Sequence, residues 1–416
     1  MSFGPKTGLF FIFVVAALVP ASGYDNAMGT GARSLRWPKG PIKIAISTSL
    51  SAFGTGIRSG SSANEAFLRS LQKWEEVANI DFEIVSTEAS AISPSGAYGD
   101  GISIVTIGSD SENILAFAKD NANAPALTRV FYDNHGQITE ADMVLNPVQA
   151  FSSDHVPGTY DLETVFTHEI GHLLGLKHSY VPSAAMFDGV LRNSVVVFDA
   201  HPNTLSKDDV TKIRGLYGPP VSSIECCAAI KGKAGELSMA WLQDTQTGAL
   251  VQMIRSNADG EFEFNGLEFG RYEVFAQPVD KDGLTPATDL GERKVDGIDT
   301  IPAIRLSANR TSSFALEYIG FTGQVSKRAL RVSRGQLYRV TVAGKGLGQD
   351  GLSFGATTRK IGLTPLRLDT RDVPGGMSAV GLEMNIDSTI HQGQYSIFAE
   401  DRAGNRRYFV GAIWVE

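Results

Sequence analysis

A thirteen-residue stretch, 167–179, constrains the fold of this chain more than any other feature of the sequence. It reads T-H-E-I-G-H-L-L-G-L-K-H-S and holds three of the chain's seven histidines, at positions 168, 172 and 178. His168 and His172 are four residues apart, so on a helix both imidazoles project from one face, one turn apart. The spacing therefore predicts a helix that ends near Gly175, because glycine tolerates the positive φ with which a chain turns back.

The turn after Gly175 predicts a metal site. It brings His178 toward His168 and His172, and such imidazoles hold Zn²⁺ at roughly 2.0–2.1 Å. Glu169 points about a quarter-turn away from the ligand face, so it can miss the metal and still reach a water bound to it. Three protein ligands with an open fourth position are the pattern of a catalytic zinc site, whereas structural sites are closed.

An amphipathic core helix is the alternative interpretation of the same stretch. An apolar face is present; it consists of Leu162, Val165, Phe166, Ile170, Leu173 and Leu174. That face explains the leucines but not three histidines at these spacings, so we favour the zinc site.

The pattern H-E-x-x-H-x-x-G-x-x-H resembles the metzincin metalloproteases, and further residues are similar to the matrixin branch of that clan. Met186, eight residues after His178, looks like the Met-turn that lies beneath the zinc. Ser179 directly follows the third histidine, as in matrixins, and Asp188 stands where astacins and serralysins carry a tyrosine ligand. Residues 205–218 resemble the last helix of a matrixin catalytic domain. The resemblance covers roughly residues 36–218.

This resemblance implies an α+β metzincin fold, a twisted five-stranded sheet with three helices. It implies that His168, His172 and His178 hold one catalytic zinc and that Met186 is a packing floor. The implied function is that of a secreted zinc endopeptidase. It would hydrolyse peptide bonds of extracellular proteins, those of the extracellular matrix included, through a zinc-bound water activated by Glu169.

One part of the sequence departs from the animal members of the family. They carry a second, structural zinc on a histidine-rich loop after the third strand, and residues 108–126 contain no histidine here. We therefore expect no structural zinc. Calcium is left open, with Glu140, Asp142 and neighbouring carbonyls as candidate ligands.

Length and charge bound the organisation and the partners. A chain of 416 residues is too long for one ordinary domain. A net charge of −8 without a basic block argues against nucleic acid or an anionic membrane as partner. Protein or peptide substrate is the partner that the site implies.

The predicted organisation is a signal peptide, a leader, a protease domain and two β-sandwiches, at residues 1–23, 24–40, 41–218, 225–308 and 309–416. Lys6, the apolar run 9–18 and the small residues 21–23 are typical of a signal peptide. Its removal would leave no transmembrane segment; an uncleaved anchor is the alternative interpretation of residues 1–23. The predicted localisation is secreted and extracellular, with the periplasm or the cell surface as alternatives.

Within the protease domain, alternating or β-rich runs predict five strands, and helical spacing predicts three helices. The strands are expected near 42–46, 80–84, 102–105, 127–132 and 138–146, and the helices begin near Ser62, Asp161 and Ser206. Family analogy makes 127–132 the edge strand beside the cleft, where a peptide substrate adds as a further strand.

The C-terminal half reads as all-β after a linker at 218–223. Turn signals separate alternating runs, and the pattern at 225–308 is similar to the carboxypeptidase regulatory-like sandwich. Residues 309–416 look like an immunoglobulin-like sandwich. Such domains imply a surface or matrix ligand. Because every proposed catalytic residue precedes the linker, we expect a chain ending near Gly218 to keep activity on a short peptide. If the sandwiches target the enzyme, that chain would lose activity on bulky or insoluble substrates.

The only cysteines, Cys226 and Cys227, are adjacent. A disulfide between neighbours closes at best a strained small ring, so the pair predicts no disulfide framework. They are expected to be two small residues at the start of a strand, with intermolecular pairing as the alternative.

The rival function is a secreted binding or adhesive protein with a vestigial protease domain. The retained Glu169 argues against it, because a dead site has no chemical use for the base.

Overall fold

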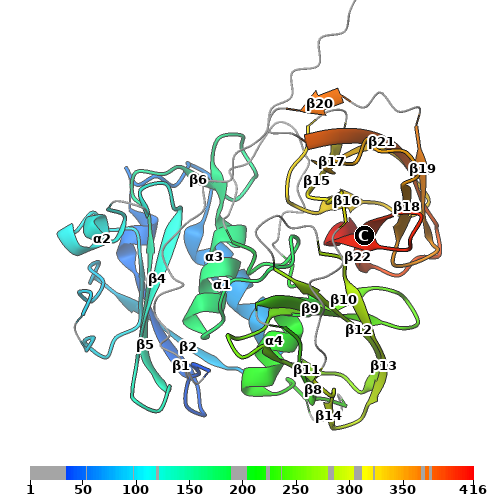
Figure 1. Ribbon diagram of the computed structural model, residues 1–416. Helices are drawn as coiled ribbons and strands as arrows, with labels where there is room; N and C mark the ends of the chain where they lie inside the picture. The colour runs from blue at the N-terminus through cyan, green and yellow to red at the C-terminus, as the bar shows by residue number, and fades with distance from the viewer. Residues whose placement is uncertain are drawn as a thin grey trace, which may run out of the picture.

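The computed structural model places three units side by side (Figure 1). It describes residues 34–52, 54–96, 98–118, 121–188, 204–221, 225–235, 237–279, 285–303, 312–321, 324–366 and 377–416, and the backbone of 371–373. The predicted signal peptide, most of the leader and the boundary at 308–309 lie outside these residues.

The N-terminal unit is built on a five-stranded sheet in the order β2-β1-β3-β5-β4. Only β4 runs antiparallel to its neighbour; the other pairs are parallel. The prediction that residues 127–132 form an edge strand is therefore confirmed. The strands are β1 Ile42–Ser47, β2 Phe82–Thr87, β3 Ile104–Thr106, β4 Ala126–Tyr132 and β5 Ile138–Leu145, with a small ladder of β6 Phe151–Ser152 and β7 Tyr160–Asp161.

All three predicted helices form, and side chains cap each N-terminus as their sequences indicate. They are α1 Ala63–Glu75, α3 Leu162–Leu173 and α4 Lys207–Tyr217; a 3-10 turn, η1, covers Thr48–Ser51. Ser62 accepts a hydrogen bond from Glu65 N, and Asp161 accepts one from Thr164 N. Ser206 and Asp209 form a full capping box at the start of α4.

The segment 108–126, expected to be a loop, contains the short helix α2, Ser111–Ala116. Asn113 anchors it: this side chain is fully buried and donates to the carbonyl oxygens of Ser90 and Gly108 at 2.8 Å each. Arg129 of β4 also pairs with Glu112 at 2.9 Å. Six residues are too few for a periodicity argument, which is why the helix was not foreseen.

Helix α3 is held from the sides by aromatic residues of distant segments. The rings of Phe67 and Phe166 meet edge to face at 5.2 Å, which joins α1 to α3. Two indole N–H groups take carbonyl oxygens of α3: Trp74 donates to Thr167 at 3.1 Å, and Trp37 donates to Leu173 at 2.8 Å. The helix that carries the histidines is therefore fixed both by burial and by hydrogen bonds.

The second unit consists of two facing sheets that share one apolar core, as the alternating sequence predicts. Its sheet orders are β10-β9-β12-β13 and β11-β8-β14. The strands are β8 Ala228–Lys233, β9 Ser238–Asp244, β10 Leu250–Arg255, β11 Glu261–Leu267, β12 Gly270–Pro278, β13 Thr288–Val295 and β14 Ile298–Thr300.

The third unit is again two sheets over a common core, with β15-β17-β21-β19 facing β16-β23-β22-β18 and with β20 beside β21. Its strands are β15 Tyr318–Phe321, β16 Leu330–Val332, β17 Leu337–Lys345, β18 Ser353–Ala356, β19 Ile361–Pro365, β20 Arg371–Val373, β21 Met377–Ile386, β22 Gly393–Glu400 and β23 Arg406–Val415. The C-terminal half is all-β as predicted; its two family resemblances stay predictions.

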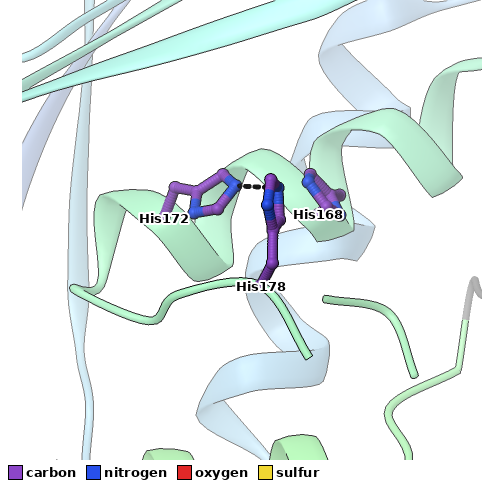
Figure 2. A group of neighbouring side chains, drawn as sticks. All are labelled: His168, His172 and His178. Carbon is purple, nitrogen blue, oxygen red and sulfur yellow. Dashed lines mark hydrogen bonds between the residues drawn. The ribbon is translucent and has the colours of Figure 1, made fainter. Parts of the chain in front are cut away.

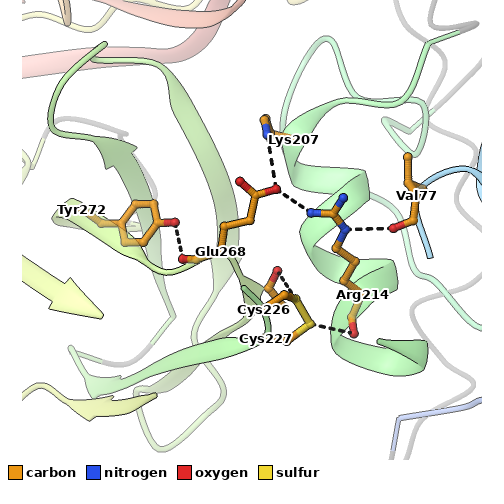
Figure 3. Close-up of a disulfide and its surroundings, with 8 residues drawn as sticks. Val77, Lys207, Arg214, Cys226, Cys227, Glu268 and Tyr272 are labelled. Atoms are coloured by element: carbon orange, nitrogen blue, oxygen red, sulfur yellow. Dashed lines mark hydrogen bonds and ion pairs between the residues drawn. A yellow bond between two sulfur atoms is a disulfide. The ribbon is translucent and has the colours of Figure 1, made fainter. Parts of the chain in front are cut away.

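Helix α4 joins the first unit to the second. The Arg214 guanidinium donates to Glu268 at 2.6 Å and to the carbonyl oxygen of Val77 at 2.8 Å (Figure 3). Gly266 lies against the helix with φ +64°, and a Cβ there would stand 1.9 Å from the carbonyl oxygen of Thr211. Only glycine allows this approach, so the packing of α4 on β11 depends on it.

The cysteine prediction needs correction, because Cys226 and Cys227 are bonded to each other in a disulfide (Figure 3). They do lie directly before β8, as expected. Their sulfur atoms sit at 3.6 Å from the carbonyl oxygens of Gly266 and Arg214, on the junction between α4 and the second unit. The sequence argument judged the eight-membered ring too constrained and did not include this packing.

Across the residues that the structure describes, no helix is both long enough and apolar enough to cross a bilayer.

Candidate active site

The three histidines of the motif converge, two from α3 and one from the loop that returns beneath it (Figure 2). The ring centroids of His168 and His172 are 4.8 Å apart, as expected one helical turn from each other. Gly175 ends the helix with φ +92°, and a Cβ there would lie 2.3 Å from the carbonyl oxygen of Leu35. The glycine that the sequence analysis singled out is thus required both for the turn to His178 and for close packing.

Hydrogen bonds fix which nitrogen of two imidazoles faces the site. Nδ1 of His168 lies 2.8 Å from the carbonyl oxygen of Ala185, and Nδ1 of His172 lies 2.9 Å from that of Leu176. A carbonyl oxygen only accepts, so each Nδ1 carries the proton and donates. Each Nε2 is left with a lone pair directed into the site, the arrangement that metal-ligating histidines show.

The nitrogen geometry fits a tetrahedral ion. The ligand atoms of the three histidines lie within 4.8 Å of one another, and Nε2 of His172 is 3.2 Å from Nε2 of His178. Two nitrogens bound to one Zn²⁺ at tetrahedral angles are separated by roughly 3.3 Å. We therefore read the short His172–His178 separation as two converging lone pairs. All four residues that the sequence singles out lie in one place, because Glu169 is close enough to His172 to interact with it electrostatically.

Burial keeps the imidazoles of His168 and His178 neutral. Burial lowers the pKa of His168 well below its usual value, and the neighbouring His172 and His178 lower it further. Burial, with the nearby His172, lowers the pKa of His178 to about 4. A neutral imidazole is the form that binds a metal, so at neutral pH no proton competes with the ion at these two positions.

Glu169 is buried beside the histidines and is held by the edge strand. Thr128 of β4 donates from Oγ1 to Glu169 Oε2 at 2.7 Å, and the same hydroxyl lies 3.2 Å from the Glu169 carbonyl oxygen. Burial raises the pKa of Glu169, and the Thr128 hydrogen bond opposes that rise. Sequence reasoning missed Thr128, because one threonine in a β-rich run carries no signal of its own.

Met186 forms the floor of the site. It is fully buried, and a Cβ added to Gly171 of α3 would meet its Sδ at 2.1 Å. Asp209 of α4 fixes the turn around it by accepting from the main-chain N–H groups of Ala185 and Met186 at 2.8 and 3.2 Å. Burial raises the pKa of Asp209 to about 6. The packing role predicted for Met186 agrees with these contacts.

Asp188 is the last described residue of this loop, and its Oδ1 lies 3.7 Å from Nδ1 of His178. That distance is too long for a direct hydrogen bond. It places a carboxylate next to the third histidine, on the side away from the proposed ion.

The candidate calcium ligands are engaged with main-chain donors. Asp142 accepts from Ser93 N at 2.7 Å and from Ile104 N at 3.2 Å, and Glu140 accepts from Gly101 N. Within the described part of the chain, the histidine trio is the group of three or more ligand-type side chains close enough to share an ion. Calcium stays a prediction.

Comparison with known families identifies the region that holds this site. Residues 37–218 match the family model described as Matrixin. Residues 37–218 are called the matrixin domain after this match. Two plant relatives carry the name metalloendoproteinase, and the matched residues span the sheet, the three long helices and the histidine trio.

Individual relatives match less than half of the chain. Metalloendoproteinase 1 of Glycine max is 31% identical over 188 residues, which are 44% of this chain and 53% of the relative. Metalloendoproteinase 1-MMP of Arabidopsis thaliana is 32% identical over 37% of each chain. Stromelysin-1 of Rattus norvegicus is 34% identical over 39% of this chain and 30% of its own length. The chain thus spans about half or less of these relatives.

Proposed function

We propose that this chain is a secreted zinc-dependent endopeptidase that hydrolyses peptide bonds of extracellular proteins. The observation that carries the proposal is the convergence of His168, His172 and His178 beside the buried carboxylate of Glu169. Secretion is proposed from the signal-peptide pattern of residues 1–23, which lie outside the described structure.

The three histidines would hold the metal through their inward nitrogens. When bound, Zn²⁺ supplies Lewis acidity, polarising a scissile carbonyl and lowering the pKa of a water ligand toward ~7. The main-chain acceptors on His168 and His172 keep both rings in the tautomer and orientation that this requires.

Glu169 would serve as the general base. It takes a proton from the attacking water and delivers it to the departing amine, a role that contributes typically 10²–10⁴-fold. Burial raises the pKa of Glu169, which makes its carboxylate a stronger proton acceptor. Thr128 supports this role because its Oγ1 donates a hydrogen bond of 2.7 Å to Glu169 Oε2 and so orients the carboxylate.

The position of strand β4 favours a substrate that binds in an extended conformation. It is the outermost strand of its sheet and contributes Thr128 to the site. An extended peptide that pairs with such an edge presents its main chain along the strand. Substrate held at both sides of the cleaved bond favours endopeptidase action over removal of terminal residues.

The test uses the purified chain, metal analysis and a peptide blocked at both ends. We expect about one zinc per chain and cleavage of an internal bond, read by mass spectrometry; a chelator should abolish the cleavage, and added zinc should restore it. Zinc binding without cleavage of any blocked peptide would favour the binding protein with a vestigial site. Failure to bind zinc would overturn the proposal.

A further inference from the structure

The carboxylate of Asp208 connects the loop that follows His178 with the second unit. Asp208 lies in the first turn of α4 and is fully buried. Its Oδ2 accepts from Ser179 Oγ at 2.6 Å and from Lys212 Nζ at 2.7 Å. Its Oδ1 accepts from the main-chain N–H of Met253 at 2.8 Å. Three donors, one of them charged, compensate the burial of this carboxylate.

The hydrogen bond from the second unit comes from the main-chain N–H of Met253. Met253 belongs to β10, the outermost strand of the sheet β10-β9-β12-β13. Outward N–H groups of such a strand have no partner within their own sheet. Met253 gives its N–H to Asp208. The second unit therefore contributes a main-chain group, at a defined position, to the support of the first.

The other arm of Asp208 reaches the residue that follows the third histidine. Ser179 donates its own N–H to the carbonyl oxygen of Met186 at 2.6 Å, and its Oγ accepts from Val181 N at 3.0 Å. Ser179 thus closes the base of the loop that carries the Met-turn. Fixing its hydroxyl fixes the backbone that leads out of His178.

Apolar packing embeds the same loop between all three units. Val181 and Ala184 are buried in a cluster with residues of the second and third units, namely Trp241, Leu250, Phe275 and Val410. Gly411 of β23 comes so close that a Cβ there would lie 3.2 Å from Val181 Cγ1. Close packing transmits displacement because such an interior has little free volume.

We propose that Asp208 is a positioning residue through which the second unit holds His178 in place for the metal. His168 and His172 stand on a rigid helix, whereas His178 stands on a loop, so the third ligand depends most on outside support. This inference rests on the zinc site proposed above. The Met253 N–H, Asp208 and the Ser179 hydroxyl form the connection.

The first test removes the N–H of the second unit without touching the matrixin domain. Met253→Pro deletes this donor, and an outer strand tolerates proline where the N–H points outward. Met253→Ala is the matched control, because it shortens the side chain and keeps the N–H. Zinc affinity is measured by competition with a chromophoric chelator. We expect about tenfold weaker binding for Met253→Pro, as for other losses behind a metal ligand, and a change under about twofold for Met253→Ala.

A second variant keeps the test decisive if proline disturbs the strand. Ser179→Ala removes only the hydroxyl on the other arm, and it should weaken zinc binding to a similar degree. A residue with a purely structural role would lower the unfolding temperature of the metal-free protein and leave zinc affinity unchanged. Loss of zinc affinity in the folded variants supports positioning.

The outcomes separate this inference from the proposed function. Wild-type protein that binds no zinc overturns the proposed function itself. Wild-type protein that binds zinc, together with folded Met253→Pro and Ser179→Ala variants of unchanged affinity, overturns the positioning role alone.

Discussion

Glu169 and the three histidines have different proposed roles in the site and are held by different contacts. The side chain of Glu169 is held by Thr128 of the edge strand, whereas those of His168 and His172 are held by main-chain carbonyl oxygens of the loop after α3. The proposed base is therefore held by a different part of the fold from two of the proposed metal ligands. Removing the base and removing a ligand should have separable effects.

Replacing Glu169 by Ala is expected to lower the rate of peptide hydrolysis by about 10²–10⁴-fold, because it removes the proton acceptor. Zinc content should stay near that of the wild type, since no ligand is lost. His172→Ala is the matched comparison and should lose metal and activity together. Metal analysis and a peptide assay on both proteins check this; a Glu169→Ala protein with near wild-type rate contradicts the assigned base.

The buried carboxyl group of Asp142 should make the stability of the folded protein depend on pH. Burial raises the pKa of Asp142 to about 7, with Glu140 and Asp100 adding to the rise, although the N–H groups of Ser93 and Ile104 oppose it. In the unfolded chain an aspartate has a pKa near ~3.9. The folded state therefore binds the proton more tightly, and the free energy of unfolding should fall as pH rises from about 4 to about 7.

The check is urea unfolding of the wild type and of Asp142→Asn at several pH values. Asn does not titrate, so the wild type should lose about 1–4 kcal/mol relative to the variant across this window, at up to 1.36 kcal/mol per unit. A constant offset between the two is expected from the changed hydrogen bonds. Parallel profiles would contradict the raised pKa.

Among the elements, helix α3 and the turn around Met186 depend on a close contact that Gly171 permits. Gly171 lies inside α3, where glycine costs about 1 kcal/mol relative to alanine. A Cβ there would nevertheless meet Met186 Sδ at 2.1 Å and the Trp74 ring at 3.2 Å. The sulfur is at the end of a flexible chain, but the buried indole is not free to move.

Gly171→Ala is therefore expected to destabilise the protein by about 1–3 kcal/mol, since overpacking exceeds the gain in helix propensity. Met186→Ala in the same chain should relieve part of this loss. The double-mutant cycle, measured by urea unfolding, should show a favourable coupling between the two substitutions. Additive effects would mean that the glycine and the methionine do not compete for one space.

At the scale of the whole molecule, the three units share a buried junction. Val181 and Ala184 of the matrixin domain pack against the second and third units, and Arg214 pairs with Glu268. The sequence alone predicts a domain that acts by itself, because all four site residues precede the linker. The contacts at the junction instead predict that the first unit loses stability and zinc affinity without the other two.

A chain ending after Val221 should unfold at a lower temperature and bind zinc more weakly than the full-length protein. It exposes the apolar face of the Met-turn loop and leaves Asp208 without the Met253 donor. Calorimetry and chelator competition on both proteins provide the measurement. A truncated protein with full zinc affinity and full activity on short peptides would show that the domain is self-sufficient.

The positions of the candidate site residues and the order of the elements around them were predictable from the sequence. The spacings of His168, His172 and His178 follow from helix geometry and one turn, which are local properties. The caps at Ser62, Asp161 and Ser206 are local for the same reason. These features were predictable because the interacting residues are close in the chain.

The contacts that hold the site in place could not be predicted from the sequence. Thr128 meets Glu169 across 41 residues, and Met253 meets Asp208 across 45. Single polar residues carry no periodicity, so no pattern in the sequence links such partners. The same holds for the bonded pair Cys226–Cys227, whose place against α4 depends on how the second unit docks. The spacing of the three histidines is a local property. The contacts that hold the site form only when distant segments of the chain pack together, within the first unit for Thr128 and between two units for Asp208.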